Sequence, residues 1–292
     1  MNKLLIGTSD WRYDSGKGII YPVQDKINYL EEYSKQKNFV DVDQWLFGIV
    51  KLRGIRSIEN YNSTLQNDFQ FIVKVPDLIT SSHYYCKDKN KLLKENPYYL
   101  SKDLFNDFIK SLHPLQEQVA FITFQFEYLD TTKKSSSIEF LKKLYDFFIS
   151  FSHSTPPIAV ELKNPYNLNS SYFKLLRILD ISNVFLQDRI MPCIVDIYDK
   201  YKIYIRGKTI ISIQSFDRHG IKTNSNSYID REEELKEMVR MIRELQERDV
   251  KVYLNINDQH ERNTPLIIEQ INKLLYIRGS KSSKKFKSIF LF

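Results

Sequence analysis

The chain has 292 residues, of which 42% are hydrophobic, 14% aromatic and 27% charged. This composition excludes a largely disordered chain, and the length suits one large domain or two small ones. The two cysteines, Cys86 and Cys193, are far apart, which argues against a disulfide framework and against a cysteine-rich zinc site. No apolar run approaches the roughly 20 residues that cross a bilayer, and the apolar run within residues 1–7 is too short for a signal peptide. We therefore expect a cytoplasmic protein without a membrane span.

The net charge of +7 is concentrated at the carboxyl terminus. Residues 279–292 contain four lysines and no acid, so residues 1–278 carry only +3. Bulk charge is therefore weak support for nucleic-acid binding by the body of the protein. We expect one domain over residues 1–278, followed by a basic and apolar tail over residues 279–292. The tail is the feature that makes a nucleic-acid partner conceivable, and the alternative is a solvated tail.

Short β-branched or aromatic runs alternate with helical stretches along the whole chain. The predicted strands are Leu4–Ser9, Phe39–Gln44, Gln70–Pro76, Ala120–Phe126, Ile158–Lys163, Asn183–Asp188, Ile210–Ser215 and Lys251–Asn257. Apolar periodicity predicts helices most clearly over Ser137–Phe151, Arg231–Gln246 and Pro265–Leu275. Eight strand–helix alternations predict a single (β/α)8 TIM-type barrel. The rival, a doubly wound sheet, would need a glycine-rich turn after the first strand, and Ile6–Trp11 is not one.

A long segment, Asp77–Val119, separates the third and fourth predicted strands. It carries several tyrosines and lysines. Two interpretations remain open at this point: a lid over the loop side of the barrel, or an extra helix that covers the barrel flank.

Polar residues alternate with apolar ones near the ends of several strands. In a barrel the outer face packs on helices, so the polar positions must point into the lumen, near the usual active-site mouth. These positions are Asp41, Asp43, Lys74, Thr123, Gln125, Glu161, Lys163, Ser212, Gln214, Asn255 and Asn257. Burying several charges together is costly unless they pair or bind something. One interpretation is therefore a ligand pocket, and the other is a network of charges that pair with one another and plug the barrel.

Seven motifs in order give the chain a resemblance to a known family. They are Ile6–Tyr13 with Tyr21-Pro22, Phe39–Trp45, Phe69–Thr80, Phe124–Phe126, Val160–Pro165, Tyr253–Asn257 and the following Pro265. Together they resemble the YecE-like proteins, domain-of-unknown-function family 72. The resemblance implies a TIM barrel and brings no established activity with it. An endonuclease-four-like or nucleic-acid-binding role for relatives rests on fold analogy.

The chain also departs from the pattern of that family. Ser212–Ser215 stands where the family has Arg-Leu-His-Gly, so an arginine, a histidine and a glycine are missing. Lys163 replaces the arginine of the fifth strand and loses the bidentate fork that suits carboxylate or phosphate. These departures keep open the interpretation that the protein is a catalytically degenerate scaffold.

The residues favour binding, with conversion left open, of a small anionic ligand at the carboxyl ends of the strands. Glu161, Lys163 and Asp41 are the candidate catalytic groups, with Glu161 as general acid or base. The candidate ligand-binding residues are Asp43, Lys74, Gln125, Asn255, Asn257, Trp11 and Tyr13. The prediction includes no metal ligand and no cofactor.

Two other functions remain open. A nucleic-acid-binding protein or phosphodiesterase would use the tail, or a divalent ion held by groups such as Asp41, Asp258 and His260. A multinuclear zinc site has little support, because the chain has five histidines and only His260 and His83 fall near the mouth. Oligomeric state is not predicted.

Overall fold

The structure is a computed structural model of the 292-residue chain. It describes residues 4–11, 21–22, 27–42, 65, 68–84, 94–127, 137–151, 156–214, 227–257 and 264–279. Side chains are described over the same ranges, except at 227–231, 264–266 and 277–279.

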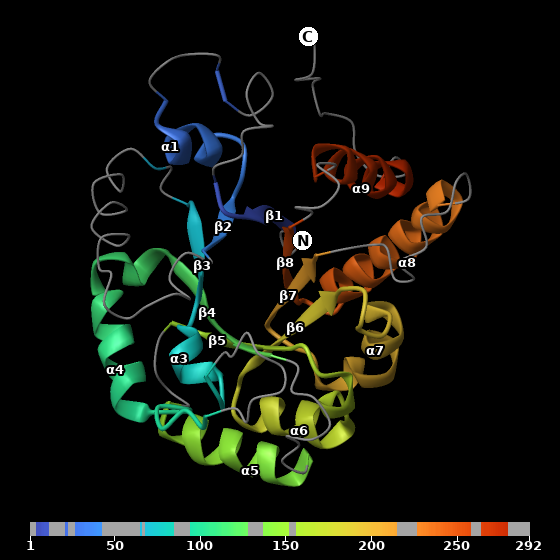
Figure 1. The fold of residues 1–292 in the computed structure, drawn as a ribbon. Coiled ribbons are helices and arrows are strands. Elements are labelled where there is room, and N and C mark those ends of the chain that lie inside the picture. The colour runs from blue at the N-terminus through green and yellow to red at the C-terminus, as the bar shows by residue number, and fades with distance from the viewer. Residues whose placement is uncertain are drawn as a thin grey trace.

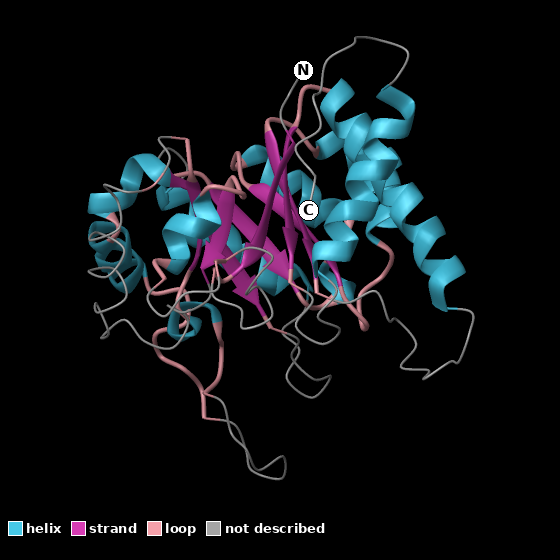
Figure 2. Ribbon diagram, turned by 90° about the horizontal axis from the view of Figure 1, so that it is seen from above, coloured by secondary structure: helices cyan, strands magenta, loops and turns pink. Residues whose placement is uncertain are grey.

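Eight parallel strands close into a barrel in which each strand pairs with its sequence neighbour and the first pairs with the last. Figure 1 shows the ring of strands surrounded by helices, and in Figure 2 the strands point the same way. The strands are β1 (Leu4–Ser9), β2 (Phe39–Val42), β3 (Gln70–Lys74), β4 (Val119–Phe126), β5 (Ile158–Leu162), β6 (Ser182–Gln187), β7 (Lys208–Ile213) and β8 (Lys251–Ile256).

Helices follow the strands and pack on the outside of the barrel (Figure 1). The α-helices are α1 (Tyr29–Ser34), α3 (Asp77–Thr80), α4 (Lys102–Ser111), α5 (Ser137–Phe148), α6 (Ser170–Ile178), α7 (Ile194–Tyr201), α8 (Ser227–Glu247) and α9 (Thr264–Gly279). Short 3-10 helices cover His113–Gln118, Ile149–Phe151, Pro165–Asn167 and Lys202–Tyr204.

The strands are covered by an apolar core on each side. The outer core lies between the strands and the helices. It is formed by every second residue of a strand, for example Val40, Val73 and Phe124. The inner core fills the lumen with the alternate residues Leu5, Phe39, Ile72, Phe121, Ala159, Val184, Ile210 and Tyr253, together with Ala120, which lies at the register shift between β3 and β4. Because these inner residues precede the polar positions in most strands, the lumen is apolar at its amino end and polar at its carboxyl end.

Gly7 lets β1 approach β2 closely inside the barrel. Gly7 pairs with Phe39 in register, and a Cβ atom at Gly7 would lie 2.3 Å from the Phe39 carbonyl oxygen and 2.9 Å from its ring. The Phe39 ring is in turn packed edge-to-face on Tyr253, with 5.4 Å between ring centroids. A glycine is therefore required where the inner aromatic cluster meets β1.

The long connection between β3 and β4 contains α4 and the 3-10 helix His113–Gln118, which cover the flank of the barrel. Phe105 of α4 is fully buried against Phe124 of β4, with ring centroids 4.9 Å apart. Asn96 holds the preceding turn by donating hydrogen bonds to the carbonyl oxygens of Leu78 and Ser81, both at 2.7 Å. For α4 the flank interpretation is correct, while residues 85–93 lie outside the described part of the connection.

The predicted fold class, a single (β/α)8 barrel, is confirmed, and all eight predicted strands are present with ends shifted by at most two residues where they are described. The helix predicted over Ser137–Phe151 is α5 followed by a 3-10 turn, and the other two clear predictions are α8 and α9. The tail beyond Gly279 lies outside the described residues.

Candidate functional site at the carboxyl ends of the strands

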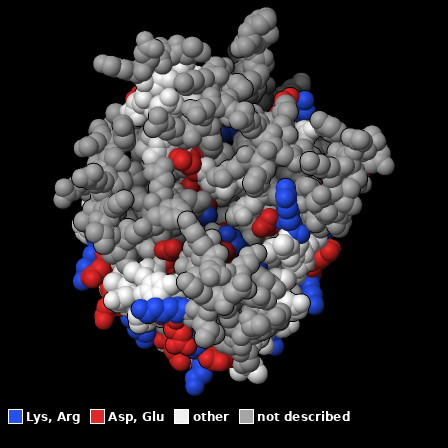
Figure 3. All heavy atoms as spheres, viewed as in Figure 1, with Lys and Arg blue, Asp and Glu red and all other residues white. Residues whose placement is uncertain are grey.

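The described polar residues of the lumen gather at the carboxyl ends of the strands, on the face seen in Figure 1. Four of them lie two positions after a residue of the inner apolar core and therefore point to the same side of their strands. The pairs are Phe39 and Asp41, Ile72 and Lys74, Ala159 and Glu161, and Tyr253 and Asn255. All four are at most 4% exposed. Figure 3 shows acidic and basic side chains together near the centre of this face.

Asp41 is the centre of a hydrogen-bonded group that spans four strands. Its Oδ2 accepts a 2.8 Å hydrogen bond from Asn255 Nδ2 and lies 3.7 Å from Lys74 Nζ. Asn255 Nδ2 also donates to Ser9 Oγ at 3.1 Å. The Asp41–Lys74 ion pair is thus longer than the hydrogen bond from Asn255 to the same oxygen.

Thr123 and Asn255 stand on the two sides of this pair. Thr123 is the register partner of Lys74 on β4. Its side chain is 2% exposed, and Thr123 Oγ1 has no hydrogen-bond partner among the described residues. Asn255 Oδ1 is equally buried and has no such partner in the same part of the chain. The lumen therefore holds two polar oxygens whose hydrogen-bonding capacity the described residues do not use.

A second charged group lies at the rim, one step further along β4 and β5. Glu127 Oε1 accepts from Gln125 Nε2 at 2.6 Å and pairs with Lys163 Nζ at 2.9 Å. Lys163 is 21% exposed and Glu127 51% exposed, so this pair is far wetter than Asp41–Lys74. The charge of Lys163 is directed at Glu127, which makes Lys74 the more deeply placed cation of the two.

Glu161 lies in the lumen beside Gln125, its register partner, and is 1% exposed. Its negative charge reaches Tyr172 of α6, on the other side of β5. Burial raises the pKa of the Tyr172 hydroxyl well above its usual range, and the Glu161 charge raises it further. Tyr172 stays neutral and donates to Asn183 Oδ1 at 2.9 Å, which anchors α6 behind the Glu161 strand.

The other predicted site residues are placed differently. Trp11 follows β1 and packs partly buried against the outer core, while its carbonyl oxygen accepts from the Tyr21 hydroxyl. Asn257 follows β8, half-buried, and its backbone N–H donates to the Ile213 carbonyl oxygen at 2.8 Å. Asp43, Tyr13, Asp258 and His260 lie outside the described residues.

The candidate site residues chosen from the sequence did not include Ser9, Thr123 or Glu127, although the alternation along the strands placed Thr123 among the inward positions. Ser9 has the same parity as Leu5 and Gly7, so the alternation rule applied to β1 would have included it. Thr123 follows from that rule too, but a threonine in a strand is a weak chemical signal. Glu127 follows the end of β4, where the alternation no longer predicts a direction.

In the described part of the chain, no group of three or more His, Cys, Asp or Glu side chains is arranged to hold a metal ion. None of the described helices is long and apolar enough to cross a membrane.

A concavity lies at the opposite end of the barrel from the polar cluster, beside the amino ends of β6 and β7. Its two arginines serve the packing of α6: Arg177 donates to the Ile203 carbonyl oxygen at 2.7 Å, and Arg206 to the Arg177 carbonyl oxygen at 3.1 Å. Amino-end features of such barrels usually serve stability, which fits these contacts.

These observations define a TIM barrel with a buried polar cluster at the carboxyl ends of its strands. The family model described as "Protein of unknown function DUF72" matches residues 5–288. Because the match covers nearly the whole chain, the protein belongs to the DUF72 family, and the resemblance seen in the motifs is confirmed.

Several solved structures share the fold of this chain. A DUF72 protein from Enterococcus faecalis is similar over 99% of this chain and 100% of its own, with a TM-score of 0.66 at 16% identity. One from Thermotoga maritima is similar over 94% of this chain and 99% of its own, with a TM-score of 0.62 at 19% identity. A psychrophilic family 10 endo-beta-1,4-xylanase shares the fold over 87% of this chain and 86% of its own, with a TM-score of 0.53 at 7% identity. A comparison with curated proteins gives no significant match.

Proposed function

We propose that this protein binds a small anionic molecule in the lumen, at the carboxyl ends of the strands. The observation that carries the proposal is a pair of buried oxygens beside the Lys74 ammonium, Thr123 Oγ1 and Asn255 Oδ1, which have no hydrogen-bond partner among the described residues. Burying polar atoms without a partner is costly, and a polar ligand in the lumen would supply one. The buried positive charge of Lys74 favours a phosphate or carboxylate as the charged group of that ligand.

The surrounding groups fit a polar ligand of modest size. Gln125 and Asn255 supply amides, and Ser9 and Thr123 supply hydroxyls, all on inward positions of neighbouring strands. Small-molecule sites typically combine a few convergent polar groups with apolar walls, and here the inner apolar core forms the floor. Glu161 and Asp41 are the groups available for proton transfer if the bound molecule is converted.

A scaffold without a ligand is the competing role. The Asp41–Lys74 and Glu127–Lys163 pairs favour it, because in each pair the two charges neutralise each other. The two roles differ in what a ligand panel does to thermal stability.

A thermal-shift panel with phosphorylated sugars, small carboxylates, nucleotides and short oligonucleotides tests the proposal. A ligand at about 100 times its dissociation constant stabilises the fold by about 2.7 kcal/mol, which is easily measured. We expect small anions to raise the melting temperature of the wild type and of Arg206→Gln, a control at the opposite end of the barrel. We expect the shift to be lost in Lys74→Met, which removes the positive charge, and to change in Glu161→Gln, which alters the charge of the lumen.

A flat panel would contradict the proposal and favour the scaffold role. A shift by oligonucleotides alone, equal in wild type and Glu161→Gln and steeply reduced by salt, would move the function to the surface.

A further inference from the structure

The orientation of the Asn255 amide constrains what the lumen can bind. Asn255 Nδ2 faces Asp41 Oδ2 at 2.8 Å, and an ionised carboxylate accepts hydrogen bonds only. The amide nitrogen must therefore be on the Asp41 side, where it also reaches Ser9 Oγ at 3.1 Å. Asn255 Oδ1 is left on the other side of the amide, buried and without a hydrogen-bond partner among the described residues.

Thr123 gives a second, independent constraint on the far side of Lys74. Its Oγ1 is buried with no partner in the described part of the chain, on the strand next to Lys74 and in register with it. A buried hydroxyl that makes no hydrogen bond is costly, and valine would fill the same volume without that cost. A threonine at this position is explained if something in the lumen bonds to it.

The strands fix the order in which these groups follow one another around the lumen. Asn255 lies on β8, Asp41 on β2, Lys74 on β3 and Thr123 on β4, and these strands are consecutive in the ring apart from β1, which supplies Ser9. The Asp41–Lys74 pair is thus flanked on one side by a carbonyl oxygen, which can only accept, and on the other by a hydroxyl.

We propose that the ligand is a hydroxylated anion, in which a phosphate or carboxylate that meets Lys74 is joined through one or two carbons to a hydroxyl that bonds Thr123 Oγ1, with Asn255 Oδ1 as an acceptor for a further donor of the ligand. This inference rests on the proposed function and narrows its ligand class. A ligand hydroxyl can donate to Asn255 Oδ1 and exchange a hydrogen bond with Thr123 Oγ1. A ligand ammonium would instead place a second positive charge beside Lys74 in a buried lumen, which is unfavourable.

The test compares matched pairs of probes by isothermal titration calorimetry. Glycerol 3-phosphate is compared with n-propyl phosphate, and glycerate with propionate, so that each pair shares its carbon chain and anionic group and differs in hydroxyls. The two pairs also distinguish a phosphate from a carboxylate as the anionic group. We expect the hydroxylated member of one pair to bind wild-type protein at least about tenfold more tightly than its hydroxyl-free partner. A probe without the hydroxyl leaves buried polar groups of the protein unpaired.

Thr123→Val is the decisive variant because it is nearly isosteric and removes only the hydroxyl. We expect it to fold, to bind the hydroxyl-free probe as the wild type does, and to lose most of the preference within the pair. Thr123→Ser, which keeps the hydroxyl, should retain the preference. Equal binding of both members in wild type, or an unchanged preference in Thr123→Val, would overturn this inference alone. If neither pair binds, the proposed function fails together with it.

Discussion

Lys74 Nζ lies 3.7 Å from Asp41 Oδ2 on adjacent strands, and both side chains are almost completely removed from solvent. Removing one member of such a pair leaves the other charge buried without its ionic partner, which typically costs about 3–5 kcal/mol. We therefore expect Lys74→Met to lower the free energy of unfolding by that order, measured by urea denaturation.

The double variant Lys74→Met/Asp41→Asn removes both charges and keeps an amide in place of the carboxyl. We expect it to be more stable than the sum of the two single changes predicts, because no lone charge remains. Strictly additive effects would show that the two side chains are not energetically coupled.

The fold follows from the sequence because its signals are local and repeated. Val40 and Val73 point outward to the helices, whereas Phe39 and Ile72 point into the lumen. Because side chains alternate along a strand, Asp41 and Lys74 must also point into the lumen. The pairing of Lys163 with Glu127 could not be predicted in the same way. It depends on side-chain directions beyond the strand ends, where the alternation stops.

The position of Trp11 shows the same limit. Its motif at the end of β1 suggested a place in the site, but its side chain packs on the outer core because the backbone turns at Asp10, whose φ is 67°. A positive φ at a non-glycine residue breaks the alternation of the strand. Nothing in the local pattern signals that turn.

Gly7 is predicted to be intolerant of any side chain. A Cβ atom would contact the Phe39 carbonyl oxygen at 2.3 Å, and that oxygen belongs to the paired strand and cannot move independently. We expect Gly7→Ala to destabilise the protein by about 1–3 kcal/mol through overpacking. The measurement is thermal and urea denaturation beside Gly207→Ala, where a Cβ atom would meet nothing within 4 Å but φ is +67°.

The two glycine variants separate two causes. Steric overlap predicts a large loss at Gly7, whereas backbone strain alone predicts about 1 kcal/mol at Gly207. Equal losses at both positions would contradict the close approach of β1 to β2.

Asp180 ends helix α6 in the left-handed conformation, with φ 54°. The Ile181 N–H donates to the Leu176 carbonyl oxygen at 2.9 Å and the Asp180 N–H to that of Arg177, which is the Schellman pattern. Glycine is favoured here, and a negative charge at a helix carboxyl end is unfavourable. We expect Asp180→Gly to stabilise by about 0.5–1 kcal/mol in urea denaturation.

Asp180→Asn serves as its control, because it removes the charge and tolerates the same φ. A smaller gain for Asn than for Gly would assign the difference to backbone freedom. A loss of stability in Asp180→Gly would mean that the exposed ion pair with Arg206, at 3.8 Å, contributes more than the strain costs.

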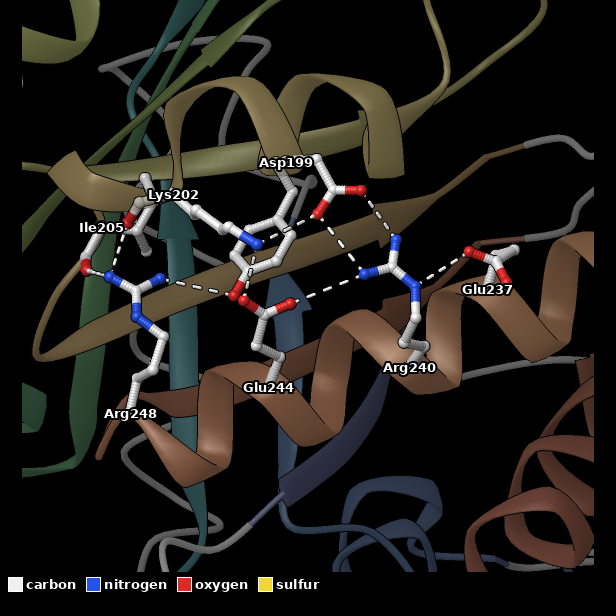
Figure 4. Close-up of polar contacts among 8 residues, drawn as sticks. Asp199, Lys202, Ile205, Glu237, Arg240, Glu244 and Arg248 are labelled. Carbon is white, nitrogen blue, oxygen red and sulfur yellow. Dashed lines mark hydrogen bonds and ion pairs between the residues drawn. The ribbon is translucent and has the colours of Figure 1, made fainter.

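Arg240 of α8 connects α8 to α7 on the surface of the barrel (Figure 4). Its guanidinium donates to both Asp199 carboxylate oxygens, at 2.8 and 3.4 Å, and to Glu237 at 2.9 Å. The hydrogen bonds from Arg240 lower the pKa of Asp199 below its usual 3.8. Because the group is largely exposed, we expect Arg240→Gln to cost only roughly 0.2–1 kcal/mol at neutral pH and low salt.

The pH dependence of this cost has a definite sign. A carboxyl whose pKa is lower in the folded state stabilises the fold above its unfolded pKa, and this contribution is lost as the pH falls through the folded value. The difference in unfolding free energy between wild type and Arg240→Gln should therefore be constant above about pH 5 and shrink below about pH 4. High salt should reduce it as well, because 1 M salt screens charges beyond about 3 Å. A difference that does not shrink as the pH falls below about 4 would show that Arg240 acts through packing of its aliphatic stem on α7 instead of through Asp199.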